Sequence, residues 1–400
     1  MAQQATTANA NGPIWGGADN GVQSTTTERR ELYLKLFSGE MFKGFQRNTI
    51  ARDLVTRRTL KNGKSLQFIY TGRTKAEFHV PGQSILGNDE KTPPVAEKTI
   101  QCDDLLISSA FVYELDETLA HYDLRGEISR KIGYALAENY DRRIFRAISK
   151  AARQPAPVSM TNFKEPGGSI VKVGAANSTD ATDCYDSAKL VQAFFEAAAI
   201  LDEKGVTTDG RVAVLNPRQY YELIRNCATN NLINRDETGD ALQSGNGILD
   251  IAGIKIYKSM NIPFLGDYGV NLANLPSGAV SNINEAASKG SFVGEDMDDQ
   301  DAASVPTGQK TVNNYGTAAK FGGSCGLIFQ KEAAGVVEAI GPQVQVTSGD
   351  VSVVYQGDVI LGRLAMGADF LNPAAAVELV AGVDVSANWN NTAVSNASFT

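Results

Sequence analysis

Ser324 is the residue whose setting most resembles that of a catalytic nucleophile. It lies in the sequence Gly-Gly-Ser-Cys-Gly at 322–326, which matches the G-x-S-x-G pattern of a hydrolase elbow. Such an elbow needs a histidine downstream, whereas the two histidines, His79 and His121, both precede Ser324. Triads with other chain orders exist, so a serine hydrolase using Ser324 stays open as the least favoured alternative. A strand that begins with small residues explains the same pattern.

Other patterns could bind a phosphate or a metal, and each has a simpler structural explanation. The glycine spacing from Gly205 is that of a phosphate loop, but Arg211 stands where Lys and then Ser or Thr are needed. The acidic stretch 294–301 could bind calcium, but its spacing is not that of an EF-hand and indicates a solvated loop. Cys325 has no histidine near it in sequence, which favours a buried structural thiol. We therefore predict no enzyme, no catalytic residue, no cofactor and no metal site.

The composition is that of a globular chain with room for a sizeable core. It has 400 residues, 42% of them hydrophobic, and a net charge of −8. Residues 1–153 carry a balance of +4 and residues 154–400 a balance of −12, and an acidic body disfavours tight, sequence-reading contacts with nucleic acid. The four cysteines have no paired spacing, which predicts reduced thiols. We expect no signal peptide and no membrane span.

The elements that position these residues begin with a flexible polar arm over residues 1–27, followed by a short amphipathic helix. Residues 59–112 are strand-rich and predict an extended β-hairpin with a polar tip before Pro93 and Pro94. Its return is predicted as a single run over 95–115. A lone hairpin is marginal in water, and the rest of the chain shows no evident support for it.

The strongest periodic signal predicts a long helix over about 123–152. Apolar residues recur every four positions from Leu124 to Ile148, and Asp123 suits the N-cap. Such a helix would span roughly 42 Å, which suits a spine. Further on, a helix between Asp186 and Gly205, a strand, and a helix that begins at Pro217 indicate a compact α+β unit.

Several of these segments together resemble the major capsid proteins of short-tailed, autographivirus-type podophages. The resemblance covers 30–153 and 320–382 well and is patchy between them. Its markers in this sequence are Gly63 to Ser65, Gly72 to Thr74, Pro81 and Gly82, Leu105 and Leu106, His121 to Asp123, and the closing stretches 326–338 and 361–380.

The resemblance implies an α+β protein with the Hong Kong 97-type capsid fold and a structural role. Copies of the chain would form hexamers and pentamers of an icosahedral shell around double-stranded DNA, bound without sequence specificity. A scaffolding protein and a portal would take part in assembly. The segments 154–185, 266–318 and the one after 382 could face outward and bind a cement protein or nothing. The location implied is the virion, after synthesis in the host bacterial cytoplasm, with non-covalent lattice contacts. A different virion or surface-layer structural protein stays as the alternative.

On this basis we expect six segments: the N-terminal arm and short helix 1–58, the extended hairpin and return strand 59–112, the peripheral domain 113–185, the axial domain 186–318 with a surface loop at 266–318, the closing strands 319–382, and the C-terminal extension 383–400. Arg73 and Lys75 would meet carboxylates on a neighbouring copy, and Phe78 would fill an apolar gap there. The full set of candidate interface residues is Gly72, Arg73, Thr74, Lys75, Phe78, Pro81, Gly82, Arg29, Arg30, Arg142 and Arg143.

Overall fold

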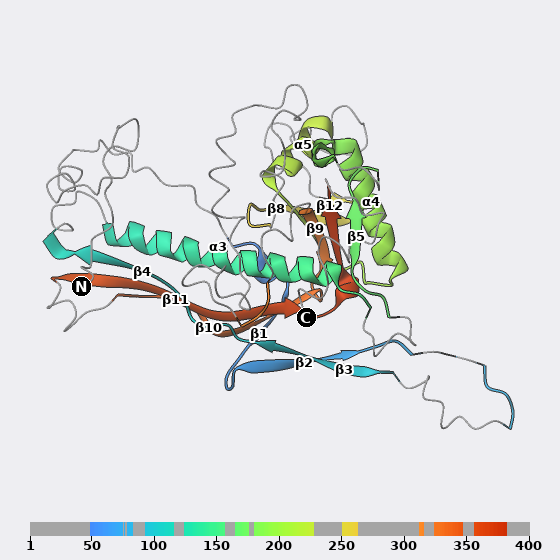
Figure 1. Ribbon diagram of the computed structural model, residues 1–400, viewed down its shortest axis with the longest axis horizontal. Helices are drawn as coiled ribbons and strands as arrows, with labels where there is room; N and C mark the ends of the chain where they lie inside the picture. The colour runs from blue at the N-terminus through green and yellow to red at the C-terminus, as the bar shows by residue number, and fades with distance from the viewer. Residues whose placement is uncertain are drawn as a thin grey trace. The chain divides into compact units, whose positions relative to one another are not determined.

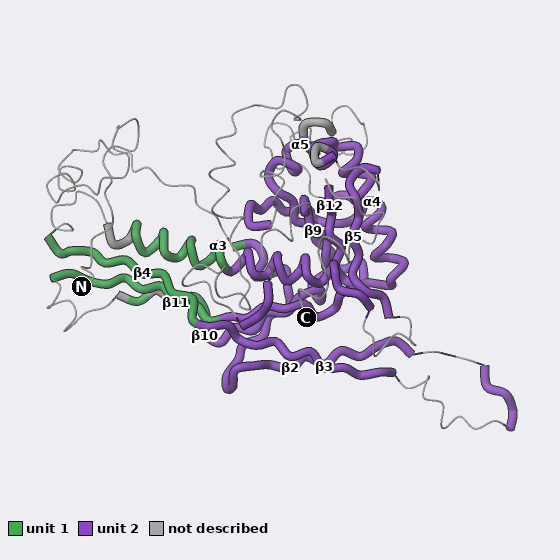
Figure 2. Tube along the Cα trace, viewed as in Figure 1, with its two compact units in different colours: residues 1–49, 105–139, 340–365 green, residues 50–104, 140–339, 366–400 purple. Residues whose placement is uncertain are grey.

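The computed structural model divides the chain into two compact units (Figure 2). Unit 1 comprises Met1–Thr49, Leu105–Asn139 and Ile340–Ala365, and unit 2 comprises Ile50–Asp104, Tyr140–Ala339 and Met366–Thr400. The residues that the structure describes are 49–74, 76, 78–82, 93–115, 124–156, 165–175, 180–227, 250–262, 312–315, 324–346 and 356–381. The predicted arm, the helix after it, and the acidic stretch 294–301 lie outside them.

Unit 1 is built on an antiparallel strand pair. Strand β4 (Leu106–Tyr113) pairs with β11 (Gly357–Phe370), whose last residues belong to unit 2 (Figure 1). The sheet has the strand order β1-β10-β11-β4, in which β1 (Thr56–Thr59) and the first residues of β10 (Ala334–Val346) also belong to unit 2. Helix α3 (Leu124–Arg153) packs closely on the pair, because a Cβ at Gly362 would lie 2.4 Å from the Ile132 side chain. Glycine at this position is therefore what lets the helix approach the strand.

Helix α3 confirms the predicted long helix to within a residue at each end, but its second half differs from an amphipathic spine. Its apolar stripe is buried from Ile132 to Ile148, as the periodicity indicates, and Ile128 is partly buried. From Asp141 to Arg153, in unit 2, every residue is buried, including five basic ones. Some of these charges are paired inside the unit: Arg153 donates to Glu378 at 2.5 and 2.7 Å, and Lys150 lies 3.0 Å from Asp369.

The body of unit 2 is a six-stranded mixed sheet in the order β5-β12-β9-β6-β8-β7. Its strands are β5 (Ser169–Lys172), β6 (Arg211–Leu215), β7 (Asp250–Ile251), β8 (Ile254–Lys258), β9 (Ser324–Gln330) and β12 (Ala376–Val380). Strand β6 pairs parallel with β8 and antiparallel with β9, and β12 pairs antiparallel with β9 and parallel with β5. Every residue of β6, β9 and β12 is buried, so both faces of the sheet's centre are covered.

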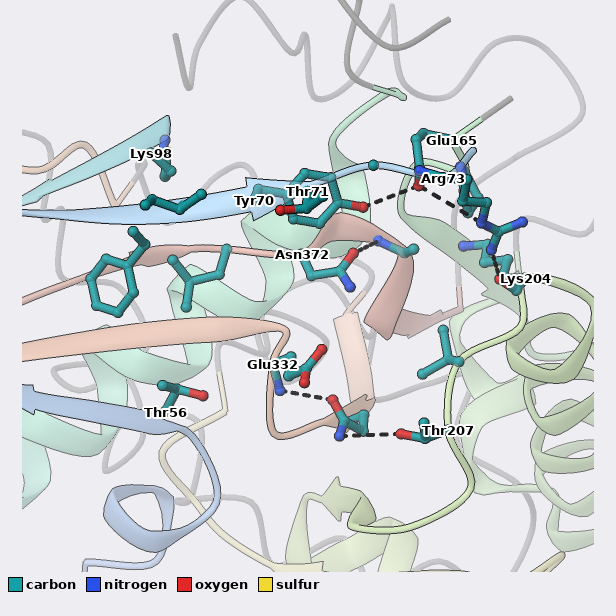
Figure 3. A pocket seen from close by; sticks show the side chains of 18 of the residues that line it. Thr56, Tyr70, Thr71, Arg73, Lys98, Glu165, Lys204, Thr207, Glu332 and Asn372 are labelled. Atoms are coloured by element: carbon teal, nitrogen blue, oxygen red, sulfur yellow. Dashed lines mark hydrogen bonds and ion pairs between the residues drawn. The ribbon is translucent and has the colours of Figure 1, made fainter. Parts of the chain in front are cut away.

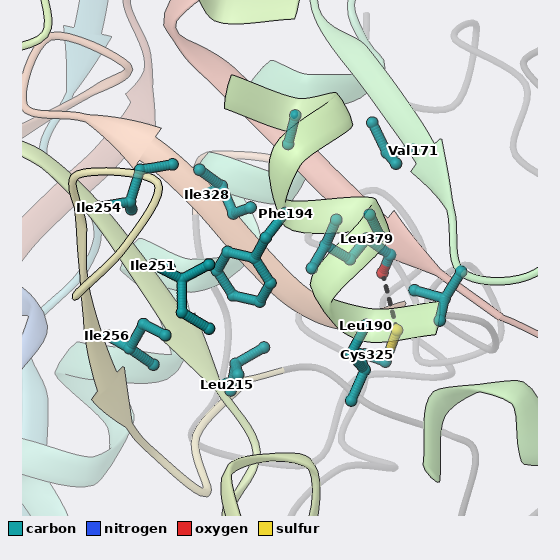
Figure 4. Close-up of a cluster of buried hydrophobic side chains, with 14 of the residues drawn as sticks. Val171, Leu190, Phe194, Leu215, Ile251, Ile254, Ile256, Cys325, Ile328 and Leu379 are labelled. Atoms are coloured by element: carbon teal, nitrogen blue, oxygen red, sulfur yellow. Dashed lines mark hydrogen bonds between the residues drawn. The ribbon is translucent and has the colours of Figure 1, made fainter. Parts of the chain in front are cut away.

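Helices α4 (Ser187–Glu203) and α5 (Pro217–Cys227) supply an apolar cluster to one face of this sheet (Figure 4). Phe194 of α4 lies close to Ile251 and Ile328 there. The predicted start and stop of α4 are confirmed: the Asp186 side chain accepts from the Ala188 amide, and Gly205 has φ +69. These local signals could be read because each acts within a few residues.

The remaining elements of unit 2 include a separate two-stranded ribbon. Strands β2 (Ser65–Thr71) and β3 (Val95–Gln101) pair antiparallel from Ser65 opposite Gln101 to Thr71 opposite Val95 (Figure 1). The other elements are η1 (Ala51–Asp53), β1, η3 (Ala181–Tyr185), the first part of β10 and η6 (Pro373–Ala375). None of the described helices is long and apolar enough to cross a membrane.

The predicted single return strand over 95–115 is wrong. The structure breaks it after Gln101, and the next strand, β4, pairs with β11 in another sheet. The break centres on Asp103, whose buried carboxylate accepts hydrogen bonds from the Val312 and Asn313 amides and the Tyr315 hydroxyl. The chain at Asp103 is therefore bound to residues 312–315, and the pairing of β3 with β2 ends at Gln101.

Candidate functional site

The hairpin β2–β3 and the body of unit 2 enclose a groove of about 520 Å³ (Figure 3). The ribbon contributes one wall, from Phe68 to Arg73 together with Lys98. The opposite wall comes from the turn after α4, the turn between β9 and β10, and the segment before η6. The expectation that nothing in the chain supports the hairpin is therefore wrong.

The inner face of the ribbon is held by buried apolar side chains, Phe68 among them, and by one charged anchor. Phe68 is buried, and the guanidinium of Arg58 lies 4.7 Å from its ring centre. Lys98 lies 2.8 Å from a carboxylate oxygen of Asp369 and 3.8 Å from the ring centre of Phe370. Cation–π and ion-pair contacts of this kind each contribute modestly, but they fix which face of the ribbon meets the body.

The end of β2 is held by Glu165. Its carboxylate accepts from the Tyr70 hydroxyl at 3.1 Å and from the backbone N–H of Arg73, and the Arg73 guanidinium donates to the carbonyl of Lys204 (Figure 3). Burial and the neighbouring Glu165 charge raise the pKa of Tyr70 to about 12. Tyr70 is therefore a hydrogen-bond donor at every physiological pH.

Lys204 joins the same wall. Its ammonium group donates to the carbonyl of Gly167 at 2.7 Å, and burial lowers its pKa to about 8. A charged amine is costly to bury, and this one is already hydrogen-bonded to the Gly167 carbonyl. Lys204 therefore joins the turn after α4 to the segment of Gly167. It is less suited to binding an external anion.

The outer face and the far end of the hairpin have the opposite character. Ile69 is 76% exposed and Phe78 is 101% exposed, and Val80 and Val95 are exposed as well. Gly82 has φ +91, a conformation that strongly favours glycine in the turn it occupies. Large apolar side chains that gather on one projecting element mark a surface that other molecules cover.

The candidate interface residues fall into three groups. Gly72, Arg73, Thr74, Phe78, Pro81 and Gly82 lie on the described part of the hairpin beyond β2, and all but the half-buried Gly72 are exposed. Lys75, Arg29 and Arg30 lie outside the described residues. Arg142 and Arg143 are only 5% and 2% exposed, and Arg143 lies 3.7 Å from the buried Asp103 of the same chain.

The residues with catalytic-looking settings have structural roles. Ser324 is 0% exposed and lies in β9, opposite Val380, so its hydroxyl is not presented at an exposed turn as a hydrolase elbow requires. Cys325 is buried as expected; its thiol donates to the Leu379 carbonyl at 3.3 Å, and burial raises its pKa. Arg211 donates to Asp202 at 2.7 Å and closes the turn after α4.

The described residues contain no candidate metal site. Among them, no group of three or more His, Cys, Asp or Glu side chains is arranged to hold an ion. The acidic stretch 294–301, singled out for calcium, lies outside that part of the chain.

Sequence reasoning missed Glu165, Tyr70 and Lys204. Glu165 lies in a segment that the sequence predicts to be an inserted loop, and Tyr70 is one residue of an alternating strand. Tyr70 and Glu165 are separated by 95 positions, so no local signal links them.

Comparisons with known proteins agree on one class. A family model described as Gp10A-like major capsid protein matches residues 67–380. The major capsid protein of Enterobacteria phage T3 is 25% identical over 381 residues, covering 93% of this chain and 98% of that protein. The capsid structure of the cyanophage P-SCSP1u aligns with a TM-score of 0.64 at 30% identity, covering 90% of this chain and 96% of that one.

A more distant structure supports the fold alone. The mature capsid of bacteriophage PhiM1 aligns with a TM-score of 0.59 at 13% identity, over 93% of this chain and 97% of that one. At so low an identity the similarity concerns the arrangement of the secondary-structure elements. It says nothing about individual side chains of the hairpin.

Proposed function

Because the chain belongs to the Gp10A-like family of major capsid proteins, we propose that its hairpin joins neighbouring copies of the chain in the phage head. The chain is a major capsid protein of a tailed phage and has the Hong Kong 97-type capsid fold. Capsid proteins of this fold self-associate, so the open question is which surfaces do so here. The hairpin is the surface that we assign to this role.

The full exposure of Phe78 is the observation that carries this assignment. A phenylalanine buries 150 to 250 Å² when it is covered, at roughly 25 cal/mol per Å² of apolar area. Phe78 stands at 101% exposure with Val80 exposed beside it, so the isolated subunit leaves this contribution unused. A neighbouring copy that covers Phe78 would gain this apolar contribution at every hairpin contact of the shell.

The charged residues beside Phe78 set the kind of neighbour that fits. Arg73 is exposed, with nearly half of its side-chain surface open, although its guanidinium also touches Lys204 in its own chain. We propose that Arg73 and Lys75 meet carboxylates on the neighbouring copy, while Phe78 fills an apolar gap there. Rim charges of this kind guide register and association rate more than affinity.

The finer features of the particle are proposals on the same basis. Hexamers and pentamers would close an icosahedral shell around double-stranded DNA, with a scaffolding protein and a portal present during assembly. A cement or decoration protein is a further partner, and synthesis would take place in the host bacterial cytoplasm. The fold family supports these features. The acidic balance of residues 154–400 fits a body that holds DNA without tight backbone contacts.

Replacement of residues 72–94 by Asn-Gly tests the role of the hairpin directly. Thr71 and Val95 are opposite each other, so a two-residue turn can close the shortened ribbon. We expect a folded subunit, with a thermal unfolding midpoint close to that of the wild type, which forms no closed shells in negative-stain micrographs. Shells of normal size and yield from this variant would refute the assembly role of the hairpin.

A further inference from the structure

Glu165 is a buried carboxylate whose hydrogen bonds to the described residues fall where the hairpin leaves the body of unit 2. Its side chain is 4% exposed and lies 3.9 Å from the Arg73 guanidinium. Its two oxygens accept from the Tyr70 hydroxyl and from the Arg73 amide. Strand β2 ends at Thr71, so Glu165 binds Tyr70 near the end of the strand and Arg73 just beyond it.

The C-terminal end of α4 provides a second hold on the same point. Arg73 donates to the carbonyl of Lys204, the residue that caps α4. The last carbonyls of a helix lack partners within it and carry the negative end of its dipole, so a cation there is favourable. The Lys204 ammonium in turn binds the Gly167 carbonyl, two residues from Glu165. The two holds therefore belong to one connected structure.

We propose that Glu165 and the Lys204 carbonyl form a clamp on residues 70–73 that sets the direction of the hairpin before a neighbouring copy binds it. Glu165 is then a positioning residue for shell assembly, since it acts through Tyr70 and Arg73 without touching the neighbour. This inference rests on the assembly role proposed above for the hairpin.

The clamp works by removing freedom before association. A two-stranded ribbon has little stability of its own, and a ribbon free to swing at Thr71 would sample many directions. That freedom would be lost when the hairpin docks, which weakens binding, whereas a ribbon already held in the docking direction loses little. A closed shell requires many correctly oriented hairpins. A small loss of orientation in each subunit therefore lowers the yield of closed particles strongly.

Glu332 offers a matched control within the same groove. It is an exposed carboxylate that lines the wall opposite the ribbon, and its backbone amide donates to Gln330 at 2.8 Å. Glu332→Ala removes a negative charge from the groove, which acts on Tyr70 only weakly and through space, but it removes no hydrogen bond to residues 70–73. Glu165→Ala removes the clamp, and Glu165→Gln keeps an acceptor oxygen in place without the charge.

Hydrogen–deuterium exchange on the full-length subunit measures the clamp itself. Loss of one net hydrogen bond should speed exchange of the Arg73 amide about tenfold in Glu165→Ala. The Glu165→Gln variant should fall between this and the wild type, and Glu332→Ala should match the wild type. Equal exchange at Arg73 in wild type and Glu165→Ala would overturn the inference.

Shell formation measures the consequence. Under conditions in which wild-type shells form, Glu165→Ala should need about tenfold more protein to reach the same yield. This assumes that each subunit loses the contribution of one hydrogen bond to the orientation of its hairpin. Its unfolding midpoint should stay near that of the wild type, and Glu165→Gln should restore most of the yield. A Glu165→Gln yield as low as that of Glu165→Ala, or a loss that only follows a lowered midpoint, would overturn the positioning role.

The two proposals fail in different ways. If the Asn-Gly replacement of 72–94 still forms normal shells, the assembly role of the hairpin is wrong. If that replacement abolishes shells while Glu165→Ala forms them at the wild-type concentration, the assembly role stands and the clamp is wrong.

Discussion

The two sheets that lie wholly within unit 2 are stabilised in opposite ways. The six-stranded sheet has central strands buried along their whole length and an apolar cluster from α4 and α5 on one face. The ribbon β2–β3 alternates between exposed and partly buried residues and buries only Phe68 and Ile100, so polar and cation–π contacts contribute much of its attachment to the body. Apolar burial therefore stabilises the first, and a few directional contacts orient the second.

The difference separates what keeps the subunit folded from what lets copies of it assemble. Burial is non-directional and scales with area, so it suits a core that must hold under any orientation of its neighbours. Hydrogen bonds and ion pairs at the hairpin add little net stability, but they specify geometry. Substitutions in the sheet should consequently act on unfolding, and substitutions in the ribbon on assembly.

Phe194→Ala in the core of the six-stranded sheet should have the largest effect on stability. Phe194 is 0% exposed and packs within the α4–α5 cluster. Removal of a buried phenylalanine ring costs about 3–5 kcal/mol, through lost burial and the cavity left behind. Urea unfolding of the subunit checks this, with Phe195→Ala as the control, because Phe195 is half exposed on the same helix. Equal losses in the two variants would contradict the comparison.

Asp141→Asn should change how stability depends on pH at the junction where the chain enters unit 2. Asp141 accepts from the amides of Ile50 and Ala51 at 2.9 and 3.2 Å, and burial raises its pKa from 3.8 to about 7. The folded state therefore holds the Asp141 proton more tightly than the unfolded state does. The stabilisation from this group is complete below about pH 4 and is lost as the pH rises to about 7.

The measurement is the free energy of unfolding of both proteins between pH 4 and pH 8. Relative to Asp141→Asn, the wild type should lose up to about 1.4 kcal/mol for each pH unit in that window. A constant difference between wild type and Asp141→Asn across the window would show that the carboxyl group does not titrate there.

Lys98→Met should weaken the anchor of the ribbon only slightly. The variant keeps the alkyl stem but loses the ion pair to Asp369 and the contact with Phe370. Asp369 keeps Lys150 at 3.0 Å, so no buried carboxylate is left without a partner, and the loss should be about 1 kcal/mol. Thermal unfolding measures it against Lys61→Met, an exposed lysine before β2. A loss above that of Phe194→Ala would reverse the ranking of the two sheets.

The sequence predicts the parts of this fold that depend on neighbours a few residues away. Helix α3, the Asp186 cap and the Gly205 stop of α4 all follow from periodicity or capping, which act locally. The closing strands and the capsid fold class follow from the combined motifs of the family resemblance.

The contacts that orient the site could not be read in the same way. The Arg153–Glu378 pair spans 225 positions and the Tyr70–Glu165 bond spans 95, so neither partner carries a signal of the other. The basic residues of α3 resemble a solvated face until their buried partners are known. The break at Asp103 was missed because the alternation of residues continues on both sides of it.

Phe78→Ala should have the smallest effect on stability and a clear effect on assembly. The side chain is fully exposed in the subunit, so its removal should change the free energy of unfolding by no more than about 0.5 kcal/mol. The same ring, once covered by a neighbouring copy, would contribute at every hairpin contact, so the yield of closed shells should fall several-fold. Phe78→Leu, which keeps much of the apolar surface, should restore most of the yield. Sedimentation of assembled particles beside urea unfolding of the subunit separates the two effects. If Phe78→Ala assembles like the wild type, the ring has no covering partner, and the part of the hairpin beyond β2 would not be the joint between copies.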